Sequence, residues 1–308
     1  PRPLFILPDP PPPPTPLGLI AGAGQLPLLV ARGMRERGHP VRAIGLIGHY
    51  DPALPELCDR FQTVGPLRVG KWGPRLRRMG VHHAVMVGRV DKANLMHDPL
   101  RMIRHVPDWR AAVLWYRRLR HDRRSSEVLL AVADELARSD VHLLDSTAHI
   151  EEHLADPGVM TDRQPTPAQW ADIEFGWPLL SEALRLDIGQ SMAVRERDVL
   201  AVEAVEGTDR MIERAGRLCR ATGWTMLKGA RMGHDRRADV PTIGETPHRH
   251  LHKAGGRCLA VAAGDVIVVD KPRTLATADE LGVALVGVPE IGPAAMQRHA
   301  ASEAPAGR

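Results

Sequence analysis

One short stretch near the start of the chain limits the folds that this protein can adopt. The apolar run Leu17–Ala21 predicts a short buried strand, and a helix is predicted over residues 26–37, before Gly38. Gly22-Ala23-Gly24 stands between the two. A strand, a glycine turn and a helix in this order are typical of the first unit of an α/β fold with a parallel sheet.

The same alternation continues through the first half of the chain. Further strands are predicted at residues 41–47 and 83–87, with a helix at 71–79 between them and another at 125–138. Right-handed crossovers then give a Rossmann-like half-fold, a parallel sheet with helices on its faces. Gly22, Gly24 and Gln25 can bind a phosphate at the helix N-terminus, although an ordinary tight turn explains the pattern equally well.

The second half of the chain has a different pattern and predicts a mixed α/β domain. Thr166, Pro167 and Gln169 form a helix start of the capping-box type, and this helix is expected to reach residue 184 with a disturbance at Pro178. A second helix is predicted from Asp209 with Thr208 as its N-cap. Strands are predicted at 191–195, 199–204, 258–262, 266–270 and 283–288.

A length of 308 residues favours two domains. The turn-rich residues 156–165 place the boundary near residue 140. The predicted organisation is a proline-rich disordered tail at 1–16, which packs against little, a Rossmann-like domain at 17–140, a C-terminal domain at 141–290 and a flexible tail at 291–308.

Composition excludes several classes of protein. Apolar runs are the length of strands and too short to cross a membrane, and the start of the chain lacks the pattern of a secretory signal, so a cytoplasmic protein is expected. Cys58, Cys219 and Cys258 have no metal-site spacing and are expected to be reduced, mostly buried thiols. The pI of about 9.3 favours an anionic ligand or surface, while an aromatic content of 4% argues against a base-stacking platform and thus against a nucleic-acid partner.

Several carboxylates stand where chemistry is conceivable. Glu206 and Asp209 flank a predicted helix start, a geometry that can hold a divalent cation or orient a phosphate, but a plain helix cap with Asp209 beside the dipole explains them as well. Glu203 falls in an otherwise apolar strand and therefore needs a partner. Asp239 precedes Val240-Pro241, so its backbone is expected to be extended and its side chain to point outward.

Two basic features have an ordinary interpretation beside a functional one. Residues 101–124 contain eight arginines together with Trp109, Trp115 and Tyr116. These side chains either form a solvated helix face or contact anionic lipid headgroups. His248, His250 and His252 lack the His-Glu-x-x-His spacing of a zinc hydrolase and are interpreted as surface histidines.

Four segments together resemble one family. They are Leu17 to Pro27, Leu186-Asp187-Ile188-Gly189-Gln190, residues 199–204 with Glu206-Gly207-Thr208-Asp209, and Asp239-Val240-Pro241-Thr242-Ile243-Gly244. In order and spacing, over about residues 17–288, they are similar to the LpxI family, the UDP-2,3-diacylglucosamine pyrophosphatases of lipid A biosynthesis. The chain departs from the family's usual pattern after Gly88, where Arg89, Lys92 and Ala93 follow, and at Arg231-Met232 and His234-Asp235.

The resemblance implies a fold and a reaction. The family has an N-terminal Rossmann-like domain and a C-terminal catalytic domain, with the lipid nucleotide bound between them. It hydrolyses the pyrophosphate of UDP-2,3-diacylglucosamine to UMP and 2,3-diacylglucosamine 1-phosphate (lipid X), with attack expected at the phosphorus nearer the sugar and with Mg²⁺ or a similar divalent cation as cofactor.

The resemblance also assigns residues. Asp239 corresponds to the essential aspartate and either binds the metal or orients water. Further metal ligands are expected among Glu206, Asp209 and Asp187. The residues expected to bind substrate and its phosphates are Gly22, Gly24, Gln25, Gln190, Thr208, Lys228 and Thr242.

The resemblance also implies partners, and two rival functions stand beside it. A diacyl substrate implies transient contact with the inner-membrane leaflet, so the protein is expected to be peripheral to the inner membrane, with residues 101–124 as the candidate contact. A homodimer is a family-level expectation. The rival is a non-enzymatic nucleotide-sugar or phospholipid-binding protein. A nicotinamide-dependent reductase is a third option, weakened by Pro27 in place of the third glycine and by the lack of a clear ribose-binding carboxylate, although Asp51 lies in the right region.

Overall fold

The structure is a computed structural model that describes residues 7–90, 108–114, 116, 125–230, 235–237 and 240–289. The chain divides into two compact units. The first unit comprises Pro1–Glu151 and Asp235–Asp239, and the second comprises Glu152–His234 and Val240–Arg308. The chain first passes from one unit to the other after Glu151, whereas the sequence predicted a boundary near residue 140. Within the described ranges, no helix is long and apolar enough to cross a membrane.

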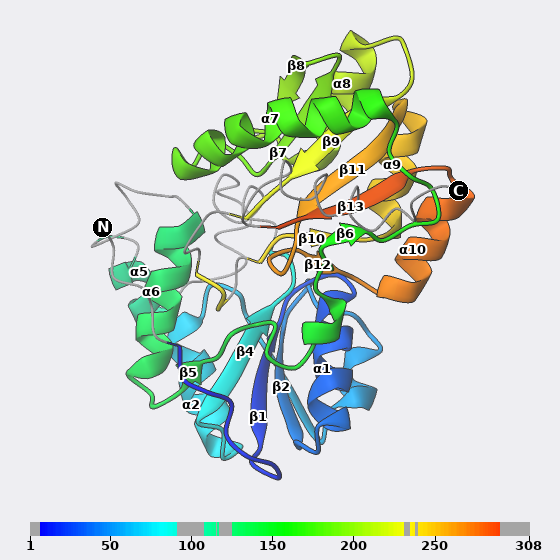
Figure 1. Cartoon of the computed structure of the whole chain (residues 1–308). Coiled ribbons are helices and arrows are strands. Elements are labelled where there is room, and N and C mark those ends of the chain that lie inside the picture. Colours follow the sequence, from blue (N-terminus) through cyan, green and yellow to red (C-terminus); the bar gives the residue numbers. More distant parts are fainter. Residues whose placement is uncertain are drawn as a thin grey trace. The chain divides into compact units, whose positions relative to one another are not determined.

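The first unit contains a five-stranded parallel sheet in the order β3-β2-β1-β4-β5. Figure 1 shows β1 between β2 and β4. The strands are β1 Leu17–Ala21, β2 Val41–Leu46, β3 Arg60–Val64, β4 His83–Val87 and β5 His142–Leu143. All five residues of β1 are buried, as expected for a central strand that is covered on both faces.

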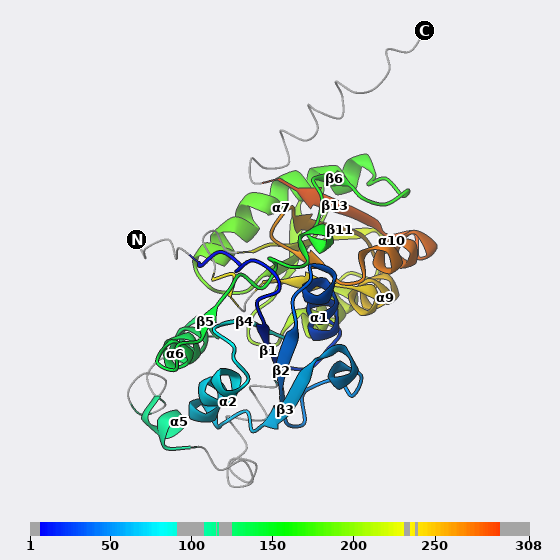
Figure 2. The same ribbon diagram turned by 90° about the horizontal axis from the view of Figure 1, so that it is seen from below.

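Helices cover both faces of this sheet. Figure 2 shows α1 on one side and α2 and α6 on the other. The helices are α1 Leu26–Glu36, α2 Trp72–Arg78, α5 Trp109–Leu114 and α6 Ser125–Ala137, with short 3₁₀ turns η1 Leu54–Leu57 and η2 Val69–Lys71. Leu76 of α2 and Leu136 of α6 belong to the same core cluster as Ile20 and Ile44 of the sheet.

The second unit contains a mixed six-stranded sheet in the order β6-β13-β11-β9-β7-β8. Strands β9, β11 and β13 are parallel, while β6, β7 and β8 pair antiparallel to their neighbours. The strands are β6 Gly158–Val159, β7 Ser191–Arg195, β8 Asp198–Val202, β9 Trp224–Lys228, β11 Gly256–Ala262 and β13 Ala284–Val288. A separate parallel pair joins β10 Thr242–Ile243 and β12 Ile267–Val268. The predicted mixed α/β class is confirmed.

One long helix and three shorter ones pack on opposite faces of this sheet. Ile173 and Leu180 of α7 pack in one core cluster with Leu227 of β9. Met211 of α8 and Leu251 of α9 pack in another with Met226, the neighbouring residue of β9, whose side chain is on the opposite face of the sheet. The helices are α7 Pro167–Arg185, α8 Thr208–Leu218, α9 Glu245–Lys253 and α10 Lys271–Glu280, and η4 is a 3₁₀ turn at Glu151–His153.

Local signals predicted the start of α7 correctly and the start of α8 incorrectly. The α7 capping box is present, with Gln169 N–H donating to Thr166 Oγ1 at 3.3 Å and Thr166 N–H donating to Gln169 Oε1 at 2.9 Å. The helix continues through Pro178 without a break. The N-cap of α8 is Gly207, at φ 83°, and not Thr208. The reason is that the Thr208 hydroxyl donates to Glu203 instead of accepting from the helix backbone.

Two further expectations need correction. The proline-rich segment was expected to pack against little, yet the Thr15 carbonyl oxygen lies 2.9 Å from His39 Nδ1, and the Thr15 hydroxyl donates to Pro12 O at 2.6 Å. His248 is not a surface histidine. It is completely buried in α9, with Nδ1 at 2.8 Å from the Gly244 carbonyl oxygen.

Candidate functional site

The predicted glycine turn lies at the carboxyl end of β1, in the first unit. Ala23 and Arg89 exchange two backbone hydrogen bonds of 2.8 Å, which tie the turn to the segment after β4. Gly22 and Gly88 are in direct backbone contact, because a Cβ atom on Gly22 would lie 2.8 Å from the Gly88 carbonyl. The Ala23 N–H is thus occupied by Arg89.

Gln25 is the residue before α1, and its side chain does not cap the helix. Gly24, at φ 101°, would have nothing within 4 Å of an added Cβ, so glycine is needed there for its backbone angle and not for space. The turn stands between β1 and β4, where the strand order reverses direction. Open α/β sheets bind ligands at such a switch point.

Three of the predicted phosphate contacts, Lys228, Thr208 and Thr242, lie around one buried cluster at the carboxyl end of β9, in the second unit. Lys228 is buried, and its Nζ donates to the Thr242 carbonyl oxygen at 3.0 Å. Thr208 Oγ1 lies 3.1 Å from both carboxylate oxygens of buried Glu203. Burial lowers the pKa of Lys228, while the nearby negative charges of Glu203 and Asp209 act in the opposite direction.

Gln190 adjoins this cluster through its backbone. Its carbonyl oxygen accepts from Gly229 N–H at 3.0 Å, directly after Lys228. The preceding residue is a glycine for steric reasons, since a Cβ on Gly189 would lie 2.0 Å from the Glu203 carbonyl oxygen. The backbone at 189–190 is therefore pressed against the segment that carries Glu203.

The carboxylates predicted as metal ligands are engaged separately. Glu206 forms an ion pair with Arg214, and Asp209 Oδ1 lies 3.2 Å from His250 Nδ1. Hydrogen bonding from its own backbone and from Arg214 lowers the pKa of Glu206. Asp187 is exposed at φ 58°, just after α7. Over the parts of the chain that the structure describes, no three His, Cys, Asp or Glu side chains gather as they would around a metal ion.

Asp239 lies outside the described residues, but the segment that precedes it does not. Arg236 Nε lies 2.8 Å from Asp145 Oδ2, and Arg236 Nη2 donates to Thr147 Oγ1 at 2.8 Å. Ser146 N–H donates to the Arg236 carbonyl oxygen at 2.9 Å. The segment is thus held by side-chain and backbone contacts within the first unit. Sequence reasoning did not find Asp145, because no local pattern marks a partner 91 positions away.

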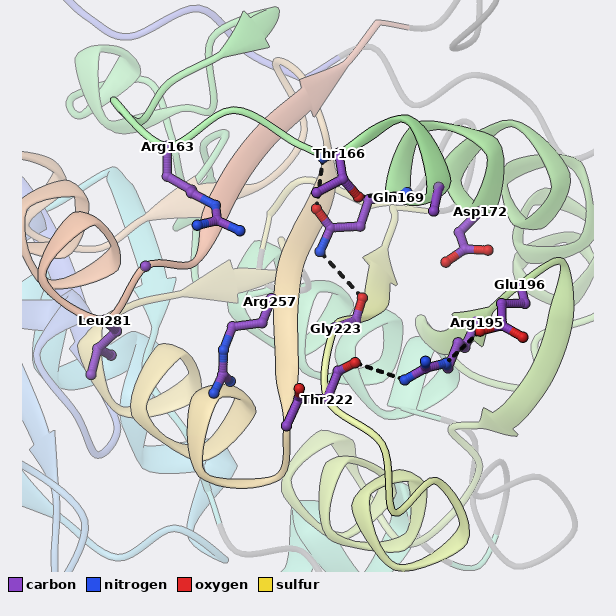
Figure 3. Close-up of a pocket in the computed structure, with 12 residues that line it drawn as sticks. Arg163, Thr166, Gln169, Asp172, Arg195, Glu196, Thr222, Gly223, Arg257 and Leu281 are labelled. Atoms are coloured by element: carbon purple, nitrogen blue, oxygen red, sulfur yellow. Dashed lines mark hydrogen bonds and ion pairs between the residues drawn. The ribbon is translucent and has the colours of Figure 1, made fainter.

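A pocket of about 570 Å³ lies at the other end of the second sheet, where β9, β11 and β13 begin (Figure 3). Its lining includes Arg163, Arg195 and Arg257. Arg195 donates to the Thr222 carbonyl oxygen at 2.7 Å and pairs with Glu196 at 3.1 Å. None of the residues lining it is a predicted site residue. This pocket and the Lys228 cluster are separate features of one sheet.

Comparison with known proteins assigns the family. The model of the LpxI N-terminal domain matches residues 16–153, and that of the LpxI C-terminal domain matches residues 156–286. The chain belongs to the LpxI family. The resemblance found in the sequence is confirmed, and the two matches meet within a few residues of the division between the compact units.

A curated relative covers nearly the whole chain. The protein from Caulobacter vibrioides named UDP-2,3-diacylglucosamine pyrophosphatase LpxI is 33% identical over 286 residues, which are 88% of this chain and 97% of that protein. Among solved structures, the biotin carboxylase domain of Hydrogenobacter thermophilus 2-oxoglutarate carboxylase aligns at 16% identity over 66% of this chain and 40% of that one, with a TM-score of 0.21. A TM-score that low carries no argument about this fold.

Proposed function

We propose that this LpxI family member hydrolyses the pyrophosphate of UDP-2,3-diacylglucosamine, giving UMP and 2,3-diacylglucosamine 1-phosphate, with attack at the phosphorus nearer the sugar. The observation that carries the proposal is the match to a UDP-2,3-diacylglucosamine pyrophosphatase over nearly its full length.

The first unit supports nucleotide binding. Its strand order β3-β2-β1-β4-β5, with the glycine turn at the switch point, supports the Rossmann-like half-fold that we propose for this unit. We assign Gly22, Gly24 and Gln25 to the substrate phosphates on this basis. Gly22 N–H donates to Val87 O and Ala23 N–H donates to Arg89 O, and Pro27 has no N–H, so Gly24 and Gln25 are the better placed donors of the turn.

The Lys228 cluster supports the assignment of pyrophosphate-binding residues in the second unit. A transferring phosphoryl group develops charge on its oxygens, and cationic groups in a water-poor site stabilise that charge. Lys228 is buried within the electrostatic reach of Asp209 in the first turn of α8, and the N-terminus of a helix also favours an anion. Lys228, Thr208, Gln190 and Thr242 are accordingly proposed to hold the pyrophosphate, with Lys228 supplying the charge.

Asp239 is proposed as the catalytic carboxylate, either as a metal ligand or as the group that orients the attacking water. Carboxylate oxygens are the donors that Mg²⁺ prefers. However, Glu206 forms an ion pair with Arg214, Asp209 lies beside His250, and Asp187 is exposed. In the described residues these three carboxylates do not gather around a common cation site. The proposal of Mg²⁺ or a similar cation rests on the family resemblance, with Asp239 as a ligand.

A diacyl substrate also supports transient contact with the inner leaflet of the membrane, from the cytoplasmic side. Much of the candidate segment 101–124 lies outside the described residues. In its described part, Trp109 is 81% exposed and Tyr116 is 67% exposed, and both are ring types found at membrane interfaces. Arg110 forms an ion pair with Glu135, with Nη1 at 3.0 Å from Oε1. We retain peripheral membrane contact and a homodimer as proposals, and a solvated helix face as the alternative to the former.

The test is incubation with UDP-2,3-diacylglucosamine and Mg²⁺, followed by mass spectrometry. Release of UMP and 2,3-diacylglucosamine 1-phosphate in equal amounts supports the proposal. Binding of the lipid nucleotide without cleavage would favour the non-enzymatic alternative, and co-purified nicotinamide would favour the reductase.

A further inference from the structure

Three polar side chains form a row across the second sheet. Ser191 of β7 lies directly opposite Lys228 of β9 in the antiparallel register. On its other side, Glu203 N–H donates to the Ser191 carbonyl oxygen at 2.8 Å, which continues the β7–β8 register by one residue. Directly opposite residues of neighbouring strands project from the same face of a sheet. Glu203, Ser191 and Lys228 therefore share the face that is covered by α8 and α9.

The middle residue of this row is buried without a partner among the described residues. Ser191 is 0% exposed, and in the part of the chain that the structure describes its Oγ makes no hydrogen bond. Its neighbours are engaged elsewhere. Glu203 accepts from Thr208, and one of the three Nζ donors of Lys228 is used by Thr242. A buried hydroxyl without a partner is costly, so its retention between a carboxylate and an ammonium group calls for an explanation.

The surroundings favour a negatively charged oxygen as the missing partner. Lys228 has donors to spare in the described contacts and stands beside Ser191. The N-terminus of α8, which reaches the row through Thr208, adds the positive end of an eleven-residue helix. We propose that the Ser191 hydroxyl and the Lys228 ammonium group together bind one non-bridging oxygen of the substrate's pyrophosphate. Ser191 is then a substrate-contacting residue of the reaction proposed above.

A purely structural serine predicts the opposite behaviour of a variant. If Ser191 stabilised the sheet, its removal would lower stability and leave substrate affinity unchanged. As a substrate contact, the orphan hydroxyl contributes nothing to the free protein, and its removal leaves stability unchanged or raises it. The sign of the stability change and the change in kcat/KM thus separate the two roles.

The experiment compares Ser191→Ala and Ser191→Cys with Thr225→Val. Thr225 is a matched control, because it is a buried hydroxyl residue on β9 whose Oγ1 donates to Asp172 at 3.4 Å, on the opposite face of the sheet. For UMP release from UDP-2,3-diacylglucosamine, Ser191→Ala should lower kcat/KM by roughly 10- to 100-fold, as for a lost hydrogen bond to a charged group. Ser191→Cys should fall between, since a thiol is a weak donor. Thr225→Val should keep kcat/KM within about twofold.

Calorimetric binding of UDP, which carries the pyrophosphate without the lipid, separates this inference from the proposed reaction. Weaker UDP binding by Ser191→Ala than by the natural chain, with an unchanged or raised Tm, supports the contact even if the natural chain releases no UMP. Equal UDP binding, or UDP binding by neither protein, would overturn the contact, as would a kcat/KM of Ser191→Ala within twofold of that of the natural chain.

Discussion

Lys228 Nζ donates to the carbonyl oxygen of Thr242 at 3.0 Å, across a loop of the chain that contains Asp239. This contact fixes one side of the loop, three residues after Asp239. On the other side, Arg236, three residues before Asp239, is bound to Asp145 at 2.8 Å. The backbone on both sides of the proposed catalytic carboxylate is therefore anchored by a charged side chain. The Lys228–Thr242 contact lies within the second unit and the Arg236–Asp145 contact within the first.

Replacing Lys228 by Met should remove the charge while filling nearly the same volume. Loss of a buried cation that stabilises developing phosphate charge is expected to lower kcat/KM by about 100-fold or more. Steady-state UMP release measures this. Lys253→Met, on the exposed part of α9, is the control and should be close to the natural chain. If the Lys228 variant kept more than a tenth of the activity, Lys228 would not be the charge that serves the pyrophosphate.

The pH dependence of activity should reflect the deprotonation of Lys228. Burial lowers the pKa of Lys228 below the ordinary 10.5, so the ammonium group is lost in the folded protein before it would be lost in an unfolded chain. Activity should fall on the alkaline side at a pH below 10.5. Because the unfolded chain binds more protons between the lowered pKa and 10.5, the lysine's contribution to stability rises with pH in that window. If the fall in activity at alkaline pH is unchanged in Lys228→Met, a group other than Lys228 causes it.

The ion pair of Arg236 with Asp145 should act on catalysis through the position of the loop. Arg236→Gln and Asp145→Asn are each expected to lower kcat about tenfold, with KM changed less, because they remove an anchor of the loop and not a substrate contact. The double variant should be no worse than either single variant, because the two changes break one interaction. The effect on stability should stay near 1 kcal/mol for a partly exposed pair.

Arg195→Gln serves as the control for this pair, since it breaks an ion pair with the exposed Glu196 in the second unit. Its kcat should be unchanged. Additive losses in the double variant of Arg236 and Asp145 would show that the two residues act independently, against a common anchoring role.

Burial of His149 should make the first unit sensitive to acid. Burial, with the neighbouring His39 and Arg37, lowers the pKa of His149 to about 4. An unfolded chain binds this proton near pH 6.5, so stability falls as pH drops from 6.5 towards 4, by on the order of 2–3 kcal/mol. Chemical denaturation at a series of pH values should show the loss in the natural chain and a smaller loss in His149→Phe. The exposed His142→Gln variant should keep the full loss.

Membrane contact through residues 101–124 predicts salt-sensitive binding to anionic vesicles. Replacing Arg117, Arg118, Arg123 and Arg124 by Gln should weaken co-sedimentation, since each basic residue near an anionic surface contributes about 1 kcal/mol. Binding that is indifferent both to salt and to these four changes would reject the segment as the contact and favour a solvated helix face.

The sequence predicted what local patterns encode. The capping box of Thr166 and Gln169 is formed by residues three apart, and β1 is a continuous apolar run, so both were found. Strand β9 was missed although it is central, because Trp224–Lys228 mixes aromatic, polar and charged residues without alternation. Helix α9 was missed because its polar, histidine-rich sequence has few apolar positions.

The candidate site shows the same limit. Glu203 was recognised as a carboxylate that needs a partner, but the partner is the Thr208 hydroxyl, which was interpreted as a helix cap. The row of Glu203, Ser191 and Lys228 depends on the pairing of three strands, and the contact of Arg236 with Asp145 joins distant parts of the chain. Neither follows from spacing, because register and loop closure are decided by tertiary packing.

UMP release by Asp239→Asn beside the natural chain, at saturating UDP-2,3-diacylglucosamine and Mg²⁺, tests the catalytic role of Asp239 in pyrophosphate hydrolysis. The variant keeps the size of the side chain and removes its charge. We expect equimolar UMP and 2,3-diacylglucosamine 1-phosphate from the natural chain and a kcat lower by about 1,000-fold or more in the variant, with substrate still bound and Tm unchanged, as for a group that acts in the transition state. Near-normal UMP release by Asp239→Asn, or no UMP from the natural chain, would contradict the account.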